Sequence, residues 1–293
     1  MAPEPRWWHE CNGRGDEPAA RCELCFRGCR IVRGALGFCG VRGYDGRGFH
    51  SSYLGRFSAV ALDPIEKKPL YHWRPGTFIL SLGGVGCNMS CPFCQNHRIA
   101  HPEAMPTDLP YTAPETLLRY ARKHGVDSVA YTYNEPTLQA EYIVSAAPLL
   151  ASGGIATVLV TNGMFSESLA EALARCTSAA NIDVKAFDAA KYRALGGSLE
   201  TVQANVERFL RAGVHVELTH LVVPGIGDAE DDFERMIEWI ASLSGEIPLH
   251  ISRYFPSYRY RHPPTDVRLL EAFAKAARQK LAHVHLGNVG PGR

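Results

Sequence analysis

Gly86-Cys87-Asn88-Met89-Ser90-Cys91-Pro92-Phe93-Cys94 is the most informative stretch of the chain. We call residues 86–94 the cluster loop. It carries three thiols at spacings of four and three residues, and no further cysteine follows until Cys176. Thiols spaced in this way can bind three corners of an iron–sulfur cube, whereas a cube with four cysteine ligands is closed and suited to electron transfer. The cluster loop therefore predicts a cluster with one open iron position, as in catalytic metal sites.

A helical stripe of cysteines and a zinc site both account for this spacing less well. Positions 87, 91 and 94 would share one face of a helix, but Gly86 before them and Pro92 among them disfavour a helix. A zinc ion would usually take a fourth protein ligand nearby.

The cluster loop resembles the signature of the radical SAM (S-adenosylmethionine) superfamily, in which a bulky or aromatic residue usually stands where Phe93 stands here. The resemblance implies that Cys87, Cys91 and Cys94 hold a [4Fe–4S] cluster and that SAM chelates the open iron. It also implies that the reduced cluster passes an electron to the sulfonium, and that a 5′-deoxyadenosyl radical then takes hydrogen from a substrate. An external one-electron reductant of the flavodoxin or ferredoxin type would supply the electron.

Around this loop, short apolar stretches alternate with amphipathic ones from Thr77 onward. Strands are predicted at residues 78–82, 128–133, 156–161, 181–185, 215–223, 249–254 and 283–286. Helices are predicted at 114–124, 136–152, 166–176, 199–212, 229–244 and 265–280. Regular alternation implies a parallel sheet with right-handed crossovers. We therefore expect an α/β fold, a partial (β/α)6 TIM-like barrel whose strand C-termini form the reactive face.

Polar residues follow the predicted strands. Tyr131-Thr132-Tyr133-Asn134-Glu135-Pro136 looks like a variant of the superfamily's Gly-Gly-Glu motif, which implies that Asn134 and Glu135 contact SAM; an Asn134 helix cap is the alternative. Asp183 and Lys185 face one way, which suits either a polar ligand or an internal ion pair. The remaining candidates for SAM binding are Phe93, Thr161, Asn162 and Asn288.

Other inward-facing polar groups are candidates for substrate contact. Glu217 alternates with Thr219, and His250 alternates with Ser252, although a structural role is the alternative for His250. Thr161-Asn162-Gly163, Asp183–Lys185 and 222–228 are similar to stretches of pyruvate formate-lyase activating enzyme. That enzyme has an acidic residue where this chain has Val160, so the resemblance gives no support to a monovalent-cation site.

The first 75 residues differ in composition from the rest of the chain: they are rich in Gly and Arg and contain five of the nine cysteines. We predict an irregular Cys-rich, metal-binding module at 1–75 and the barrel at 76–293. Cys22, Cys25, Cys29 and Cys39, here called the N-terminal cysteine set, can form a four-sulfur site. Zinc and a closed iron–sulfur cluster both suit four thiolates, as metal-stabilised structure or as an electron relay. Cys11 and Cys176 are expected to take no part.

Bulk properties exclude several classes. The 293 residues carry a formal charge of +1, which gives no overall attraction for nucleic acid or membranes. No apolar run has membrane-spanning or secretory length, so a reducing cytoplasm is expected, where cysteines indicate metal binding rather than disulfides. Residues 253–262 interleave aromatic rings with cations and could stack bases, close over a substrate or form a surface loop.

Most of the chain is similar to the radical SAM enzymes of the AmmeMemoRadiSam group. The group-specific part is Leu62-Asp63-Pro64-Ile65-Glu66-Lys67-Lys68-Pro69-Leu70, whose charged residues either bridge the two domains or form a solvated turn. We expect an enzyme that cleaves SAM to abstract hydrogen from an unidentified substrate. Two alternatives stay open: an activating enzyme that makes a glycyl radical on a partner protein, and a non-catalytic iron–sulfur carrier or adaptor.

Overall fold

A computed structural model describes residues 7–12, 17–101, 105–106 and 108–290. Its centre is an eight-stranded sheet with the order β13-β12-β11-β10-β9-β8-β7-β6. Strands β7 to β13 are parallel, as the βα alternation predicts. Their bounds are β7 Phe78–Gly83, β8 Ser128–Thr132, β9 Ala156–Thr161, β10 Ala179–Asp183, β11 His215–Val222, β12 Leu249–Arg253 and β13 Val284–Gly287.

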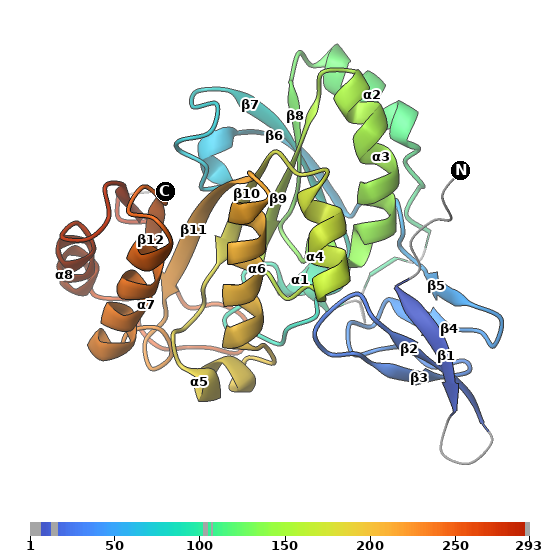
Figure 1. The fold of residues 1–293 in the computed structure, drawn as a ribbon, viewed down its shortest axis with the longest axis horizontal. Helices are drawn as coiled ribbons and strands as arrows, with labels where there is room; N and C mark the ends of the chain where they lie inside the picture. Colours follow the sequence, from blue (N-terminus) through green and yellow to red (C-terminus); the bar gives the residue numbers. More distant parts are fainter. Residues whose placement is uncertain (1–6, 13–16, 102–104, 107, 291–293) are drawn as a thin grey trace.

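Helices that connect these strands lie on the outer face of the sheet (Figure 1). They are α2 Pro114–Lys123, α3 Ala140–Ser152, α4 Glu167–Ala174, α5 Ala189–Ala194, α6 Leu199–Arg211, α7 Glu230–Leu243 and α8 Val267–Ala277. The short α1 His97–Ala100 follows the cluster loop, and the 3-10 helix η3 Pro136–Gln139 precedes α3. Ser166 and Ser198 cap α4 and α6 by accepting hydrogen bonds from backbone N–H groups of the first turn. The partial barrel predicted from the sequence is confirmed.

The sheet begins earlier than the predicted boundary at residue 75. β6 (Ala59–Pro64) pairs antiparallel with β7 and forms the edge of the sheet. The composition of residues 1–75 does not distinguish this strand, because only its long-range pairing assigns it to the barrel.

The segment that follows β6 closes the inside of the barrel. It contains the 3-10 helix η1 (Ile65–Lys67). Fully buried Ile65 and Leu70 pack against inward side chains of four neighbouring strands, namely Ile79, Ala130, Val158 and Ala179. Asn181 donates a 2.8 Å hydrogen bond to the carbonyl of Pro69, which fastens the segment from β10.

Small antiparallel sheets make up the N-terminal module, which lies beside the barrel (Figure 1). One sheet consists of β1 Trp8–Asn12, β2 Pro18–Cys22 and β3 Arg30–Val32, and the other of β4 Arg42–Tyr44 and β5 Phe49–Ser51. An isolated bridge between Cys25 and Phe165 joins the module to the barrel. Within the described ranges, no helix is long and apolar enough to cross a membrane.

Candidate active site

The three cysteines of the cluster loop line one cavity of about 490 Å³. The loop follows β7, so it stands at the C-terminal end of the parallel strands. Gly86 has a φ of +88°, which glycine adopts without strain. This glycine lets the chain turn from β7 into the loop.

The arrangement of these thiols fits a cluster better than a single ion. Throughout the described residues, no three His, Cys, Asp or Glu side chains stand close enough together to hold one metal ion. The three sulfurs line a cavity that is larger than one metal ion. Burial raises the pKa of Cys91 to about 11, although the ammonium of Lys185 acts to lower it. The thiols are thus protonated on their own, and metal binding would ionise them.

Asn134 fixes the base of the cluster loop. Its side-chain oxygen accepts a 2.8 Å hydrogen bond from the Gly84 N–H, and its amide donates to the Gly86 carbonyl at 2.9 Å. The residue predicted to contact SAM therefore also joins the end of β8 to the loop after β7. Tyr133, just before it, has a φ of +69°, an uncommon backbone conformation for a side-chain-bearing residue.

Glu135 is completely enclosed by donors from the chain itself. One carboxylate oxygen accepts from the Thr137 N–H and hydroxyl and from the Thr161 hydroxyl, at 2.6–3.0 Å. The other accepts from the Asn162 N–H at 2.9 Å. Burial raises the pKa of Glu135, and these donors act against that change. The carboxylate thus aligns the ends of β8 and β9 at the cavity wall.

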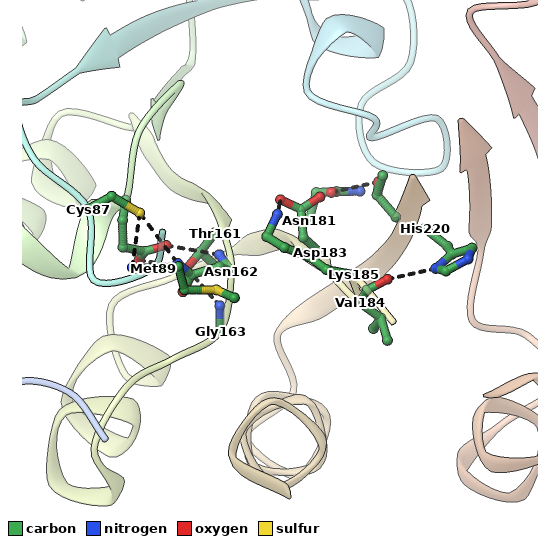
Figure 2. A network of polar contacts seen from close by, with 12 residues as sticks. Cys87, Met89, Thr161, Asn162, Gly163, Asn181, Asp183, Val184, Lys185 and His220 are labelled. Carbon is green, nitrogen blue, oxygen red and sulfur yellow. Dashed lines mark hydrogen bonds and ion pairs between the residues drawn. The ribbon is translucent and has the colours of Figure 1, made fainter. Parts of the chain in front are cut away.

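Asn162 connects the end of β9 to the cluster loop (Figure 2). Its amide donates to the Asn88 side chain at 2.8 Å and lies 3.8 Å from the Cys87 sulfur. The Met89 N–H also donates to that sulfur, at 3.4 Å. Such donors would stabilise a thiolate ligand.

Asp183 and Lys185 form an ion pair of 2.8 Å at the end of β10 (Figure 2). Burial works against the ammonium of Lys185, but the carboxylate of Asp183 outweighs it and raises the pKa of Lys185. The predicted ion pair is present and both side chains line the cavity, whereas their contact with a polar ligand stays a prediction.

The structure brings all eleven predicted cluster and SAM residues to this cavity. They are Cys87, Cys91, Phe93, Cys94, Asn134, Glu135, Thr161, Asn162, Asp183, Lys185 and Asn288. Thr219 and Ser252 also line it. The reason is that the ends of parallel strands meet at one edge of a sheet.

The cavity residues that were not predicted to line it include Lys67, Lys68 and Tyr133. The idea of a solvated charged turn is wrong for Lys68, which is 2% exposed. Its ammonium lies 2.8 Å from Asp63 and 4.4 Å from the centre of the Tyr133 ring. Burial opposes ionisation of Asp63, but Lys68 and Tyr133 hold its pKa well below the usual range. In the sequence, the adjacent residues Lys67 and Lys68 were the signal from which a role at the cavity could have been predicted.

Glu217 and His250 do not line the cavity, so their predicted contact with substrate is wrong. Glu217 is completely buried and accepts from the Tyr71 and His72 N–H groups at 3.0 and 2.8 Å. His250 lies 2.6 Å from it. Glu217 lies near the start of β11, below the edge where the site forms, and it anchors the segment that closes the barrel.

The loop of aromatic and basic residues at 253–262 covers the cluster loop. The Arg259 N–H donates to the Pro92 carbonyl at 2.9 Å, and the Ser257 hydroxyl to the Cys94 carbonyl at 3.3 Å. The Tyr260 ring meets Phe93 edge-on, with 6.4 Å between ring centres. These contacts favour closure over the site rather than stacking of bases.

Comparisons with known proteins agree with this geometry. Residues 82–240 match the family model of the radical SAM superfamily. An uncharacterised protein of Methanocaldococcus jannaschii is 34% identical over 279 residues, covering 94% of this chain and 83% of that protein. A second protein of that organism, proposed to be a glycyl-radical enzyme activating enzyme, is 26% identical over 181 residues, or 58% of this chain and 70% of its own length.

Among solved structures, the chain resembles a radical SAM methyltransferase from Sphaerobacter thermophilus. The TM-score is 0.57 at 14% identity, with 95% of this chain and 75% of that one covered. At this identity the likeness concerns the fold.

Proposed function

This chain belongs to the radical SAM superfamily, whose members use a [4Fe–4S] cluster and SAM, and we propose that Cys87, Cys91 and Cys94 hold that cluster. The single observation that carries the proposal is the shared cavity: three thiols and polar residues in or just after strands β8 to β13 line one space of about 490 Å³. When bound, the cluster supplies the electron that splits SAM into methionine and a 5′-deoxyadenosyl radical, which abstracts hydrogen from the substrate.

The chain's own residues hold and shield this chemistry. Lys185 carries a positive charge opposite Cys91, where it would offset the negative charge of a thiolate-bound cluster. The Asp183 carboxylate can accept hydrogen bonds from the ribose or ammonium of SAM. Phe93 and the 253–262 loop limit access of water to the cluster loop.

Substitution of one ligand tests the proposal. We expect Cys91→Ala to abolish formation of 5′-deoxyadenosine from SAM under anaerobic, reducing conditions. Cys176→Ala is the matched control, because this thiol lies after α4 and bonds to the Leu173 carbonyl, away from the cavity. If Cys91→Ala kept the wild-type rate of SAM cleavage, the assignment would be wrong.

A glycyl-radical activating role is a second candidate, favoured by the relative that is 26% identical. The substrate would then be an exposed glycine loop of a partner protein. Mixing the reduced enzyme, SAM and a candidate partner should give a glycyl-radical signal in electron paramagnetic resonance (EPR). If SAM were cleaved in the presence of a small-molecule substrate and no protein radical formed, this role would be ruled out.

A further inference from the structure

Two lysines line the active-site cavity without any part in the proposed chemistry. Lys67 and Lys68 belong to the segment that closes the inside of the barrel. The residues proposed to hold the cluster and SAM come instead from the ends of the parallel strands and from the loops that follow them. The two lysines therefore reach the cavity from a different part of the fold and can serve a different ligand.

A single carboxylate stands against both ammonium groups. The Lys68 ammonium lies 2.8 Å from one oxygen of Asp63, and the same oxygen accepts the 2.6 Å hydrogen bond from Tyr133. The Lys67 ammonium lies 3.3 Å from the other oxygen. Two positive charges and one negative charge leave an excess of one positive charge at this end of the cavity.

The two lysines differ in how tightly they are held. Lys68 is buried, and without Asp63 it would be an uncompensated buried charge, so it stays with the carboxylate. Lys67 is exposed, and its ammonium sits on a flexible stem that can turn toward a ligand. When Lys67 turns away, Lys68 and Tyr133 still bind Asp63. Lys67 can therefore bind an anion without breaking the buried pair.

A groove of about 580 Å³ leads into the cavity beside this group. Gln95, Asn96 and Tyr133 line both the groove and the cavity. The outer part of the groove lies between residues 59–61 of β6 and residues 97–99 of α1. Tyr133, which bonds to Asp63, thus stands where the groove meets the cavity. A molecule that enters by the groove passes the lysine group before it reaches the cluster loop.

Negative charge in the lining does not offset the excess at this end. Asp183 is paired with Lys185 at 2.8 Å, and Glu135 is enclosed by hydrogen-bond donors. Among the described residues of the groove, the ionisable side chains are the basic Arg98 and His97. The N-terminal cysteine set adds no charge here, because its four thiols line a separate cavity of about 20 Å³. A positive lining of this kind attracts anions and raises their local concentration.

We infer that the substrate carries a carboxylate or a phosphate and that Lys67 binds this acidic group. The exposed side chain of Gln95 lines the same passage and can donate a second hydrogen bond to it. Lys67 would then be a specificity-determining residue, which places the substrate relative to the cluster loop while the radical chemistry takes place at SAM. The identification of this anion as the substrate rests on the proposed function, whereas the anion site does not.

SAM also carries a carboxylate, so the test separates the two anions. The protein is reconstituted anaerobically and titrated calorimetrically with SAM, and then, with and without SAM, with inorganic pyrophosphate and with succinate. We expect the wild type to bind at least one probe together with SAM. Lys67→Met should weaken the binding of that probe at least about fivefold and change the affinity for SAM by less than about twofold. The probe that binds more tightly indicates whether the acidic group is a phosphate or a carboxylate.

Lys123→Met is the matched control. It removes an exposed lysine from the last turn of α2, outside the cavity and the groove, and should bind both probes as the wild type does. A wild type that binds neither probe, or a Lys67→Met variant that binds them equally well, would overturn the inference. An equal loss of affinity for SAM and for the probe in Lys67→Met would assign Lys67 to the carboxylate of SAM and would also overturn it. Lys67-dependent binding of a probe to a protein that never cleaves SAM would contradict the proposed function and leave the anion site standing.

Discussion

The hydroxyl of Tyr133 donates a 2.6 Å hydrogen bond to the carboxylate of Asp63, 70 residues earlier in the chain. This bond links the end of β8 to the end of β6. Lys68 completes the group by pairing with the same carboxylate at 2.8 Å. The segment that follows β6 therefore forms part of the cavity wall through Lys67 and Lys68.

Asp63 pairs with one buried lysine and one exposed lysine. Removal of the buried lysine should destabilise the fold far more than removal of the exposed one. Lys68→Met leaves the Asp63 charge without its buried cation and should lower the free energy of unfolding by about 3–5 kcal/mol. Lys67→Met is the control: this side chain, 66% exposed, pairs with the same carboxylate and should cost less than about 1 kcal/mol. Denaturant unfolding measures both, and equal losses would contradict the assigned burial.

Asn134 should be required for retention of the cluster. Asn134→Ala leaves the Gly84 N–H and the Gly86 carbonyl without their partner, at about 1–3 kcal/mol for each buried group. We expect lower stability and less iron per chain after reconstitution. Asn96→Ala is the control, because its amide makes one exposed bond, to the Tyr133 carbonyl. Wild-type iron content in Asn134→Ala would argue against this role.

Gly86 should tolerate alanine much less well than Gly76. Both have positive φ, +88° and +76°, so both substitutions carry the backbone cost of about 1–2 kcal/mol. Only at Gly86 would the new Cβ also lie within 3 Å of Cys39, Leu138 and Val41 atoms, whereas the space at Gly76 is open. We expect Gly86→Ala to lower the iron content of the reconstituted protein. Similar melting temperatures for the two variants would contradict the close approach.

Acid should destabilise the protein through the histidines around Glu217. Burial, His250 and His72 lower the pKa of His285 to about 4, against an ordinary value of about 6.5. Between these values the unfolded chain binds a proton that the folded chain does not, so stability is full above about pH 6.5 and falls as the pH drops toward 4. Glu217, whose pKa is lowered by its hydrogen bonds to His215 and His250 despite burial, extends the loss below about pH 4.5.

Melting temperatures recorded from pH 8 to pH 4 check this expectation. His285→Gln should flatten the curve between about pH 6.5 and 4. His124→Gln, an exposed position after α2, should leave the curve unchanged. An identical slope in His285→Gln and wild type would remove His285 as the cause.

Sequence reasoning worked where the relevant information is local. The three cysteines lie within eight residues, and the strand-end residues Asn134, Asn162 and Asp183 could be placed together because parallel strands end at one edge. It failed at Glu217 and His250. Their alternation with Thr219 and Ser252 predicts which face of the sheet they lie on, but it does not predict how far along the barrel axis they lie from the reactive edge. Depth depends on the segment around Tyr71, which reaches Glu217 from 146 residues away.

By itself, the sequence determined the class of fold and the strand ends that surround the three cysteines of the cluster loop, because these follow from short spacings and from the repeating βα period. Only the tertiary structure decided that β6 joins the barrel, that Lys68 is buried at the cavity and that Asn134 holds the cluster loop. It alone brought Cys39 against Gly86. These features are contacts between segments far apart in the chain, and no local pattern of residue types encodes which distant backbone will supply the partner.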